Sequence, residues 1–201
     1  MTTNQPSNWG NQDQNPSWAQ QSASSPWGSQ QPSQQQSPIQ TAAQSILAQA
    51  SQHGMQVRQT RFAGIEAFVC RDKPMGVFTR LHPFLVVGTF PSMTAHFESI
   101  TEFHKAAIAN SIQSKGGLPR GLQTGTATIT VIVTDELAPN AADWATKQRN
   151  SRFAAAGFPV TVETRTGRVM YPKSMVIGAA YLRVLGEFTE RNVVSALQRR
   201  Y

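Results

Sequence analysis

The chain has 201 residues, a formal net charge of +7 and one cysteine. A single cysteine excludes an internal disulfide framework, and no apolar run reaches the roughly 18 residues that a membrane-spanning helix requires. The length indicates one domain with an extension, not several domains.

Residues 1–40 have the composition of a disordered tail. They contain eleven Gln, eight Ser, five Pro and four Asn, with Asp13 as their one acid and no Lys or Arg. Such a segment has too few aliphatic side chains to offset the entropy lost on ordering, so we expect it to stay disordered. It lacks the basic and apolar regions of a secretory signal and the arginines of a transit peptide, which predicts a cytoplasmic location.

Three tryptophans recur at even intervals in this tail. Trp9, Trp18 and Trp27 are nine residues apart, and each is followed by Gly or Ala. Large flat side chains can anchor a segment in the pockets of a protein partner, and repeated weak anchors reinforce one another. Chance spacing and self-association of a Gln-rich tail are the alternatives. Without cations, the tail is a poor nucleic-acid arm, although tryptophan rings can stack on unpaired bases.

Residues 41–201 carry all 18 basic residues against 10 acids and predict a basic α+β domain. Thr41–His53 has the pattern of a short amphipathic helix that ends at Gly54. Strand patterns follow over 56–70, with a bulge at Gly64, and over 77–80 and 84–90, with His82-Pro83 between the last two. Because their links are short, we expect an antiparallel meander.

Helices and strands alternate in the rest of the domain. A helix that starts near Pro91, capped by Ser92 or Thr94, has apolar residues at three- and four-residue intervals: Phe97, Ile100, Phe103, Ala107, Ile108 and Ile112. Then follow a central strand over 126–134, a helix over 140–156, a hairpin of strands 158–163 and 168–171, and a helix over 176–198. The order α-βββ-α-β-α-ββ-α predicts a single α+β domain, with helices packed on one mixed, mainly antiparallel sheet.

The search for reactive groups favours a protein that is not an enzyme and holds no metal or cofactor. Metal-dependent nucleases share the α-βββ-α-β order, but they need a carboxylate two residues before the lysine, where this chain has Arg71 before Lys73. His96 and His104 are eight residues apart and lack the i, i+4 spacing of zinc ligands on one helix. His53 and His82 add no such pattern.

The remaining reactive groups have simpler structural interpretations. Cys70 lies in an apolar run and is expected to be a buried hydrophobic residue, with a reactive thiol as the alternative. The glycine-rich segment 116–121 follows a helix and precedes a strand, the reverse of a phosphate loop. Asp135 and Glu136 form the best-placed acidic pair, because the ends of strands often border ligand sites. A capping role for this pair is the simpler interpretation.

The basic residues provide a second candidate site. Those expected to bind an acidic partner or nucleic acid are Arg58, Arg61, Arg71, Lys73, Arg80, Arg165 and Arg168. If they converge in the fold, they form one positive surface. Our leading hypothesis is a non-enzymatic adaptor, whose domain binds one protein partner while the tryptophan-bearing tail recruits another. The alternative is a nucleic-acid-binding protein, and a homodimer joined through an edge strand is a further hypothesis.

Overall fold

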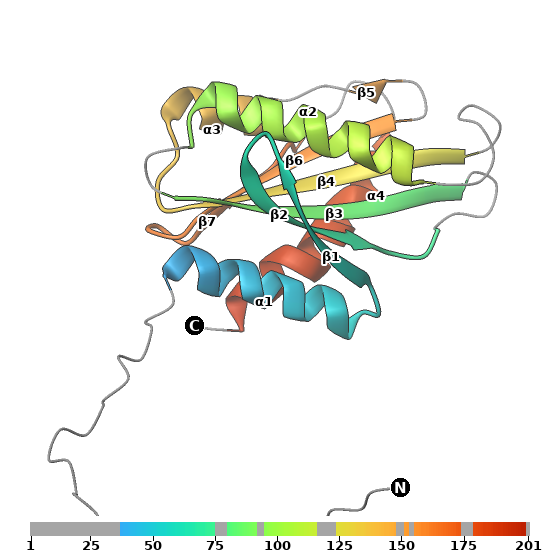
Figure 1. Cartoon of the computed structure of the whole chain (residues 1–201), viewed down its shortest axis with the longest axis horizontal. Helices are drawn as coiled ribbons and strands as arrows, with labels where there is room; N and C mark the ends of the chain where they lie inside the picture. Colours follow the sequence, from blue (N-terminus) through green and yellow to red (C-terminus); the bar gives the residue numbers. More distant parts are fainter. Residues whose placement is uncertain are drawn as a thin grey trace, which may run out of the picture. The chain divides into compact units, whose positions relative to one another are not determined.

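One mixed β-sheet forms the middle of the folded domain, and helices cover both of its faces (Figure 1). The structure is a computed structural model that describes residues 37–74, 80–91, 95–115, 124–147, 151–152, 155–173 and 179–199. The α+β class and the expected order of elements are confirmed, with one short strand added.

The sheet has seven strands. They are β1 (Gln56–Phe62), β2 (Ile65–Arg71), β3 (Arg80–Phe90), β4 (Thr124–Thr134), β5 (Ser151–Arg152), β6 (Ala155–Glu163) and β7 (Arg168–Met170). Their order is β1-β2-β3-β4-β6, and β5 and β7 both pair with β6 at the far edge. The three central strands β3, β4 and β6 are parallel, and every other pairing is antiparallel.

Two helices cover one face of the sheet and two helical segments cover the other. The helices α2 (Phe97–Ser114) and α3 (Pro139–Lys147) link the parallel strands, and because both crossovers step across the sheet in the same direction, both helices lie on the same face. The opposite face packs against α1 (Pro38–Gln52) and a C-terminal segment of α4 (Ala179–Thr189), a π-turn (Glu190–Val194) and α5 (Ser195–Gln198). No described helix is long and apolar enough to cross a membrane.

The central strand β4 contributes side chains to the hydrophobic cores on both faces of the sheet, as the alternation of its apolar residues predicts. Ala127, Ile129, Val131 and Val133 belong to the cluster beneath α1, whereas Ile132 belongs to the cluster beneath α2. All five residues are fully buried.

The meander has three strands, but its boundaries differ from the prediction. The region 56–70 is a tight hairpin, turned at Ala63 and Gly64 with φ angles of 47° and 79°, and not one strand with a bulge. Residues 80–90 form one strand through Pro83, while 77–79 lie outside the described residues. The carbonyl of Pro83 faces the end of β2, where it accepts a hydrogen bond from the Asp72 backbone N–H at 3.3 Å. A backbone N–H at position 83 would face the same place. Because proline lacks that N–H, the sheet loses only one hydrogen bond, at the end of the β2–β3 pairing.

Several helix ends also differ from the prediction. The first helix begins at Pro38, because the Ser37 hydroxyl accepts the Gln40 amide and proline suits the first turn, so residues 37–40 belong to the domain and not to the tail. The second begins at Phe97 after the N-cap His96, and the proposed caps Ser92 and Thr94 lie outside the described residues.

The helix predicted over 140–156 ends at Lys147, and residues 151–152 and 155–156 are strand residues. The sequence pattern of this stretch suits a helix, but Ala155 and Ala156 instead pair with β4 in the parallel part of the sheet. Pairing with a neighbouring strand therefore outweighs the local helical pattern here. The C-terminal helix contains the π-turn, which sequence periodicity did not indicate. The Gln49 side chain donates a hydrogen bond from Nε2 to the Arg191 carbonyl at 3.1 Å, and the Asn192 side chain contacts His53 at 2.7 Å. These polar contacts hold α1 against the C-terminal segment.

Candidate functional site

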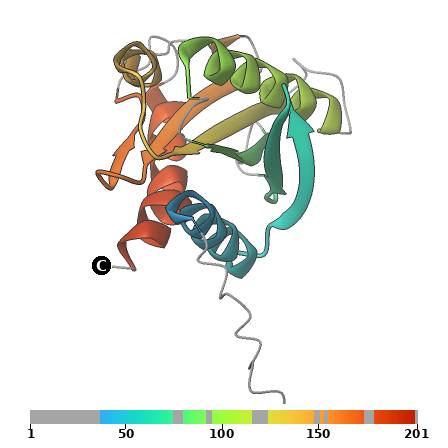
Figure 2. The same cartoon turned by 60° about the vertical axis from the view of Figure 1, so that its left-hand side comes forward.

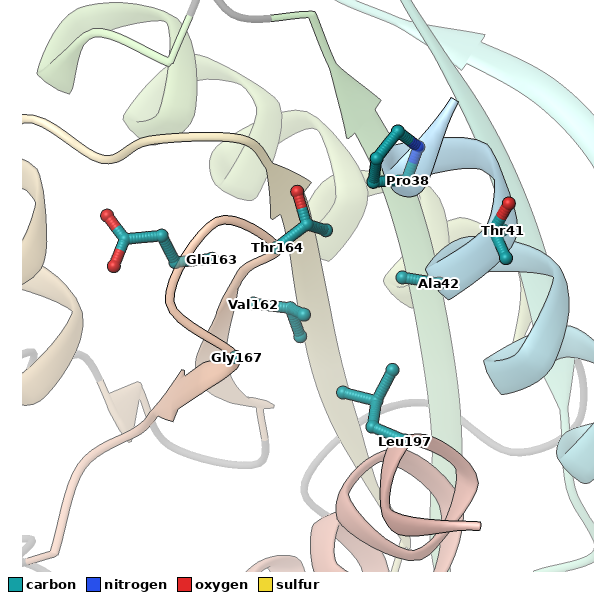
Figure 3. A pocket seen from close by; sticks show the side chains of 8 residues that line it. All are labelled: Pro38, Thr41, Ala42, Val162, Glu163, Thr164, Gly167 and Leu197. Carbon is teal, nitrogen blue, oxygen red and sulfur yellow. The ribbon is translucent and has the colours of Figure 1, made fainter. Parts of the chain in front are cut away.

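A small hollow lies where β6 ends, beside the start of α1 and the side of α5 (Figure 3). Its volume is about 190 Å³, and Ala42, Val162 and Leu197 give it an apolar lining. The carboxyl ends of parallel strands are the usual place for ligand sites in sheets with helical crossovers. Here, however, the Glu163 carboxylate points away from the apolar side chains (Figure 3).

The three acids at this end of the sheet have partners within the domain. Glu163 is buried, and its carboxylate accepts the Leu137 amide at 3.1 Å and the Thr166 hydroxyl. Asp135 accepts the Thr164 hydroxyl at 3.2 Å, and Glu136 pairs with Arg165 at 2.7 Å. The acidic pair singled out in the sequence therefore joins the loop after β4 to the β6–β7 hairpin. Among the described residues, no three His, Cys, Asp or Glu side chains are grouped so that they could hold a metal ion.

The thiol of Cys70 belongs to the core beneath α1. The residue is fully buried, and burial raises the pKa of the thiol to about 12. A thiol with that pKa is almost entirely protonated at neutral pH, and the thiolate is the reactive form. The interpretation of Cys70 as a buried hydrophobic residue is confirmed.

The histidine His104 lies inside the opposite core. Its Nδ1 contacts the Thr130 hydroxyl at 2.6 Å, its ring packs edge-on against Trp144 with the ring centroids 5.3 Å apart, and its Nε2 has no hydrogen-bond partner. Burial lowers the pKa of His104 to about 4, so the imidazole is neutral at physiological pH. The structure thus places this histidine in the core and leaves one of its ring nitrogens without a hydrogen-bond partner.

The two edges of the sheet are built differently. At one edge, β5 has two residues and β7 has three. Short edge strands of this kind are a common protection against pairing with another chain. At the other edge, β1 has seven residues and, within the described part of the chain, pairs only with β2. Figure 2 shows this hairpin, in teal, along the right-hand side of the domain. The open edge of β1 is therefore the longest unpaired backbone that the described sheet offers.

The hairpin geometry identifies the backbone groups of β1 that face outward. Phe62 and Ile65 flank a two-residue turn, so they form a hydrogen-bonded pair, and such pairs recur at every second residue. The N–H and C=O groups of Arg58 and Thr60 therefore face β2, whereas those of Val57, Gln59 and Arg61 face away from the sheet. The first four side chains of β1 are exposed, and Val57 is 40% exposed.

The predicted basic residues are spread across the sheet, and three of them lie in the β1–β2 hairpin. In the hairpin, Arg58 and Arg71 lie on the α2 face, because Arg58 is opposite Val69 of that core and Arg71 contacts the Phe84 ring and the Lys115 carbonyl. Arg61 lies on the other face and pairs with Glu66 at 3.7 Å.

The remaining four are distributed along the sheet. Lys73 follows β2 and is exposed, and Arg80 is the first residue of β3, where only its backbone is described. Arg165 precedes β7 and Arg168 is the first residue of β7; both are exposed and lie at the opposite edge from β1. Arg58 and Arg71 are thus neighbours, but no single edge carries all seven residues.

The sequence did not indicate Val57 or Gln59, whose backbones face outward. A sequence pattern could have identified this strand as an edge strand. The run Gln56-Val57-Arg58-Gln59-Thr60-Arg61 has no apolar face, as expected of a strand at an uncovered edge of the sheet. Trp9, Trp18 and Trp27 lie outside the described residues. No protein-family model, curated protein or solved structure matches the chain.

Proposed function

We propose that this chain is a protein-interaction protein whose folded domain receives an extended segment of a partner along the open edge of β1. The observation that supports this proposal is the contrast between the edges. One edge has strands of two and three residues, and the other has a strand of seven residues whose outer side pairs with no described strand. Added strands bind through main-chain hydrogen bonds, and the neighbouring side chains provide specificity. The outward-facing backbones of Val57, Gln59 and Arg61 offer three donors and three acceptors for this purpose.

In the same proposal, the tail recruits a second protein through Trp9, Trp18 and Trp27, which makes the chain an adaptor. The location would be cytoplasmic, and the activity would be binding without catalysis. Binding of nucleic acid is the other candidate function, and the adjacent Arg58 and Arg71 on one face of the hairpin support it. Its characteristic result is an affinity for DNA or RNA that falls steeply with salt, because released counterions drive the association.

A matched pair of variants tests the β1 edge. Gln59→Pro removes an outward N–H that β2 does not use, whereas Gln59→Ala shortens the same exposed side chain and keeps the donor. The full chain and both variants are used to isolate bound proteins from extracts of the source cells, and the recovered proteins are quantified by mass spectrometry. We expect a partner that the wild-type chain and Gln59→Ala retain and that Gln59→Pro loses.

Circular dichroism and thermal unfolding establish that both variants are folded. A chain with Trp9, Trp18 and Trp27 all changed to Ala should lose a different partner and keep the one that binds β1. If Gln59→Pro is folded and retains every partner of the wild-type chain, the proposed role of the β1 edge is wrong. If the tryptophan variant also retains every partner, the proposed role of the tail is wrong.

A further inference from the structure

We propose that the segment received by β1 is acidic, with two carboxylates three residues apart, one facing Arg58 and the other facing Arg61. This inference rests on the proposed function, because it specifies the partner of the same edge. It follows from the faces on which the two arginines lie, from the charges around them and from the spacing between them.

The two arginines lie on opposite faces of the sheet. Arg58 is opposite Val69, which belongs to the core beneath α2. Arg61 is opposite Glu66, an odd number of residues along β2 from Val69, and therefore lies on the α1 face. A strand added outside β1 places its own side chains alternately on the same two faces, beside each arginine in turn.

Both arginines can accept a further carboxylate. No ion pair joins Arg58 to any other described residue. The pair between Arg61 and Glu66 is long, at 3.7 Å, and joins side chains that are 67% and 60% exposed. Exposed pairs of this kind contribute little to stability, so the Arg61 guanidinium is free to take a second acidic neighbour at little cost.

The surrounding charge favours an acidic partner over a second copy of this chain. The strand β1 contains two arginines and no acid, so a second β1 supplies no carboxylate to Arg58 or Arg61. Residues 41–201 carry 18 basic and 10 acidic residues, and two such domains repel each other at low salt. An acidic segment instead gains attraction from the domain as a whole and from both arginines.

The spacing defines the sequence of the segment. In an antiparallel addition, the residue opposite Arg61 comes first, the residue opposite Arg58 comes three positions later, and the next residue is opposite Val57. Residues three apart on a strand lie on opposite faces, as the arginines do, whereas on a helix they lie on the same side. The pattern is therefore acid-x-x-acid followed by an apolar residue, which covers the 40% exposed Val57.

Synthetic peptides test this pattern by fluorescence anisotropy with the full chain at low salt. The matching peptide is Thr-Glu-Thr-Thr-Glu-Val-Thr, labelled at its N-terminus. The first control, Thr-Glu-Thr-Glu-Thr-Val-Thr, has the same composition but places both acids on one face. In a third peptide, Lys replaces the second Glu of the matching sequence. We expect the matching peptide to bind about threefold more tightly than the first control, the effect of one exposed ion pair.

A charge exchange makes the test specific. Arg58→Glu should weaken binding of the matching peptide by about tenfold and should prefer the third peptide, because Lys then faces Glu at that position. Arg168→Glu, at the opposite edge, is the matched control and should leave the preference unchanged. Circular dichroism confirms that both variants are folded.

Each result separates this inference from the proposed function. If Arg58→Glu does not prefer the Lys-bearing peptide, or if all peptides bind equally, the acidic pattern is wrong, while loss of binding in Gln59→Pro still supports strand addition. If Gln59→Pro binds like the wild-type chain, strand addition is wrong as well. A single-stranded oligonucleotide of equal charge that competes as well as the matching peptide would identify the edge as a general anion surface. A dimer in sedimentation that Gln59→Pro dissociates and Gln59→Ala keeps would assign the edge to a second copy. Either finding overturns the inference.

Discussion

Acidification should destabilise the domain through His104. Free histidine has a pKa of 6.5, and burial lowers that of His104 to about 4. Between these values the unfolded chain binds a proton that the folded chain does not, so stability is fully present above pH 6.5 and falls as the pH approaches 4. The complete loss corresponds to about 3 kcal/mol, at 1.36 kcal/mol for each pKa unit.

About 2 kcal/mol of that loss should occur between pH 7.5 and pH 5. Urea unfolding at several pH values, followed by circular dichroism, measures the free energy of unfolding directly. Carboxylates also titrate in this range, so the decisive quantity is the difference between the wild-type chain and His104→Leu. His96→Gln, which removes a histidine from an exposed N-cap, is the matched control.

The physical reason lies in the surroundings of the ring. The described interactions of His104 are with Trp144 and the Thr130 hydroxyl, and neither partner carries a charge that would stabilise an imidazolium ion. If the pH dependence of His104→Leu equals that of the wild-type chain, protonation of this histidine does not limit stability, and the interpretation of its burial is wrong.

Two further predictions concern the core. A Cβ at Gly88 would come within 2.4 Å of the Phe103 ring, so Gly88→Ala should lower the free energy of unfolding by about 1–3 kcal/mol. A Cβ at Gly186 would meet nothing within 4 Å, so Gly186→Ala should be neutral or stabilising. Equal melting temperatures for the two variants would contradict this packing. Because burial raises the pKa of Cys70 to about 12, its thiol should react with a disulfide reagent only when the domain unfolds, and labelling should accelerate with urea through the unfolding transition. Rapid labelling of the folded chain at pH 7.5 would show that the thiol is accessible.

Hydrophobic periodicity predicted most of the fold. The alternation over 126–134 identified the central strand and its two faces, because a strand between two helical layers must bury both sides. The stripe from Phe97 to Ile112 identified α2 for a similar reason. The predicted ends of helices and strands were less accurate where local helix propensity competes with pairing to a distant strand. Ala155 and Ala156, for example, have good helix propensity but pair with β4.

The candidate site was harder to predict. The basic residues of the hairpin were identified, but their faces depend on a two-residue turn that includes Ala63 at φ 47°, a conformation that a residue with a side chain seldom adopts. Without that turn, the pairing register of β1 is unknown, and the backbone groups that face outward cannot be assigned. The unsatisfied nitrogen of His104 depends on contacts between residues far apart in the chain, which no local pattern indicates.

Amide hydrogen exchange along β1, measured residue by residue by NMR, tests the open edge most directly. In the free chain, the amides of Val57, Gln59 and Arg61 should exchange quickly and those of Arg58 and Thr60 slowly, because only the latter two bond to β2. Addition of the acidic peptide should slow the exchange of the first three. Slow exchange of all five amides in the free chain, or no change in the first three with saturating peptide, would contradict the account.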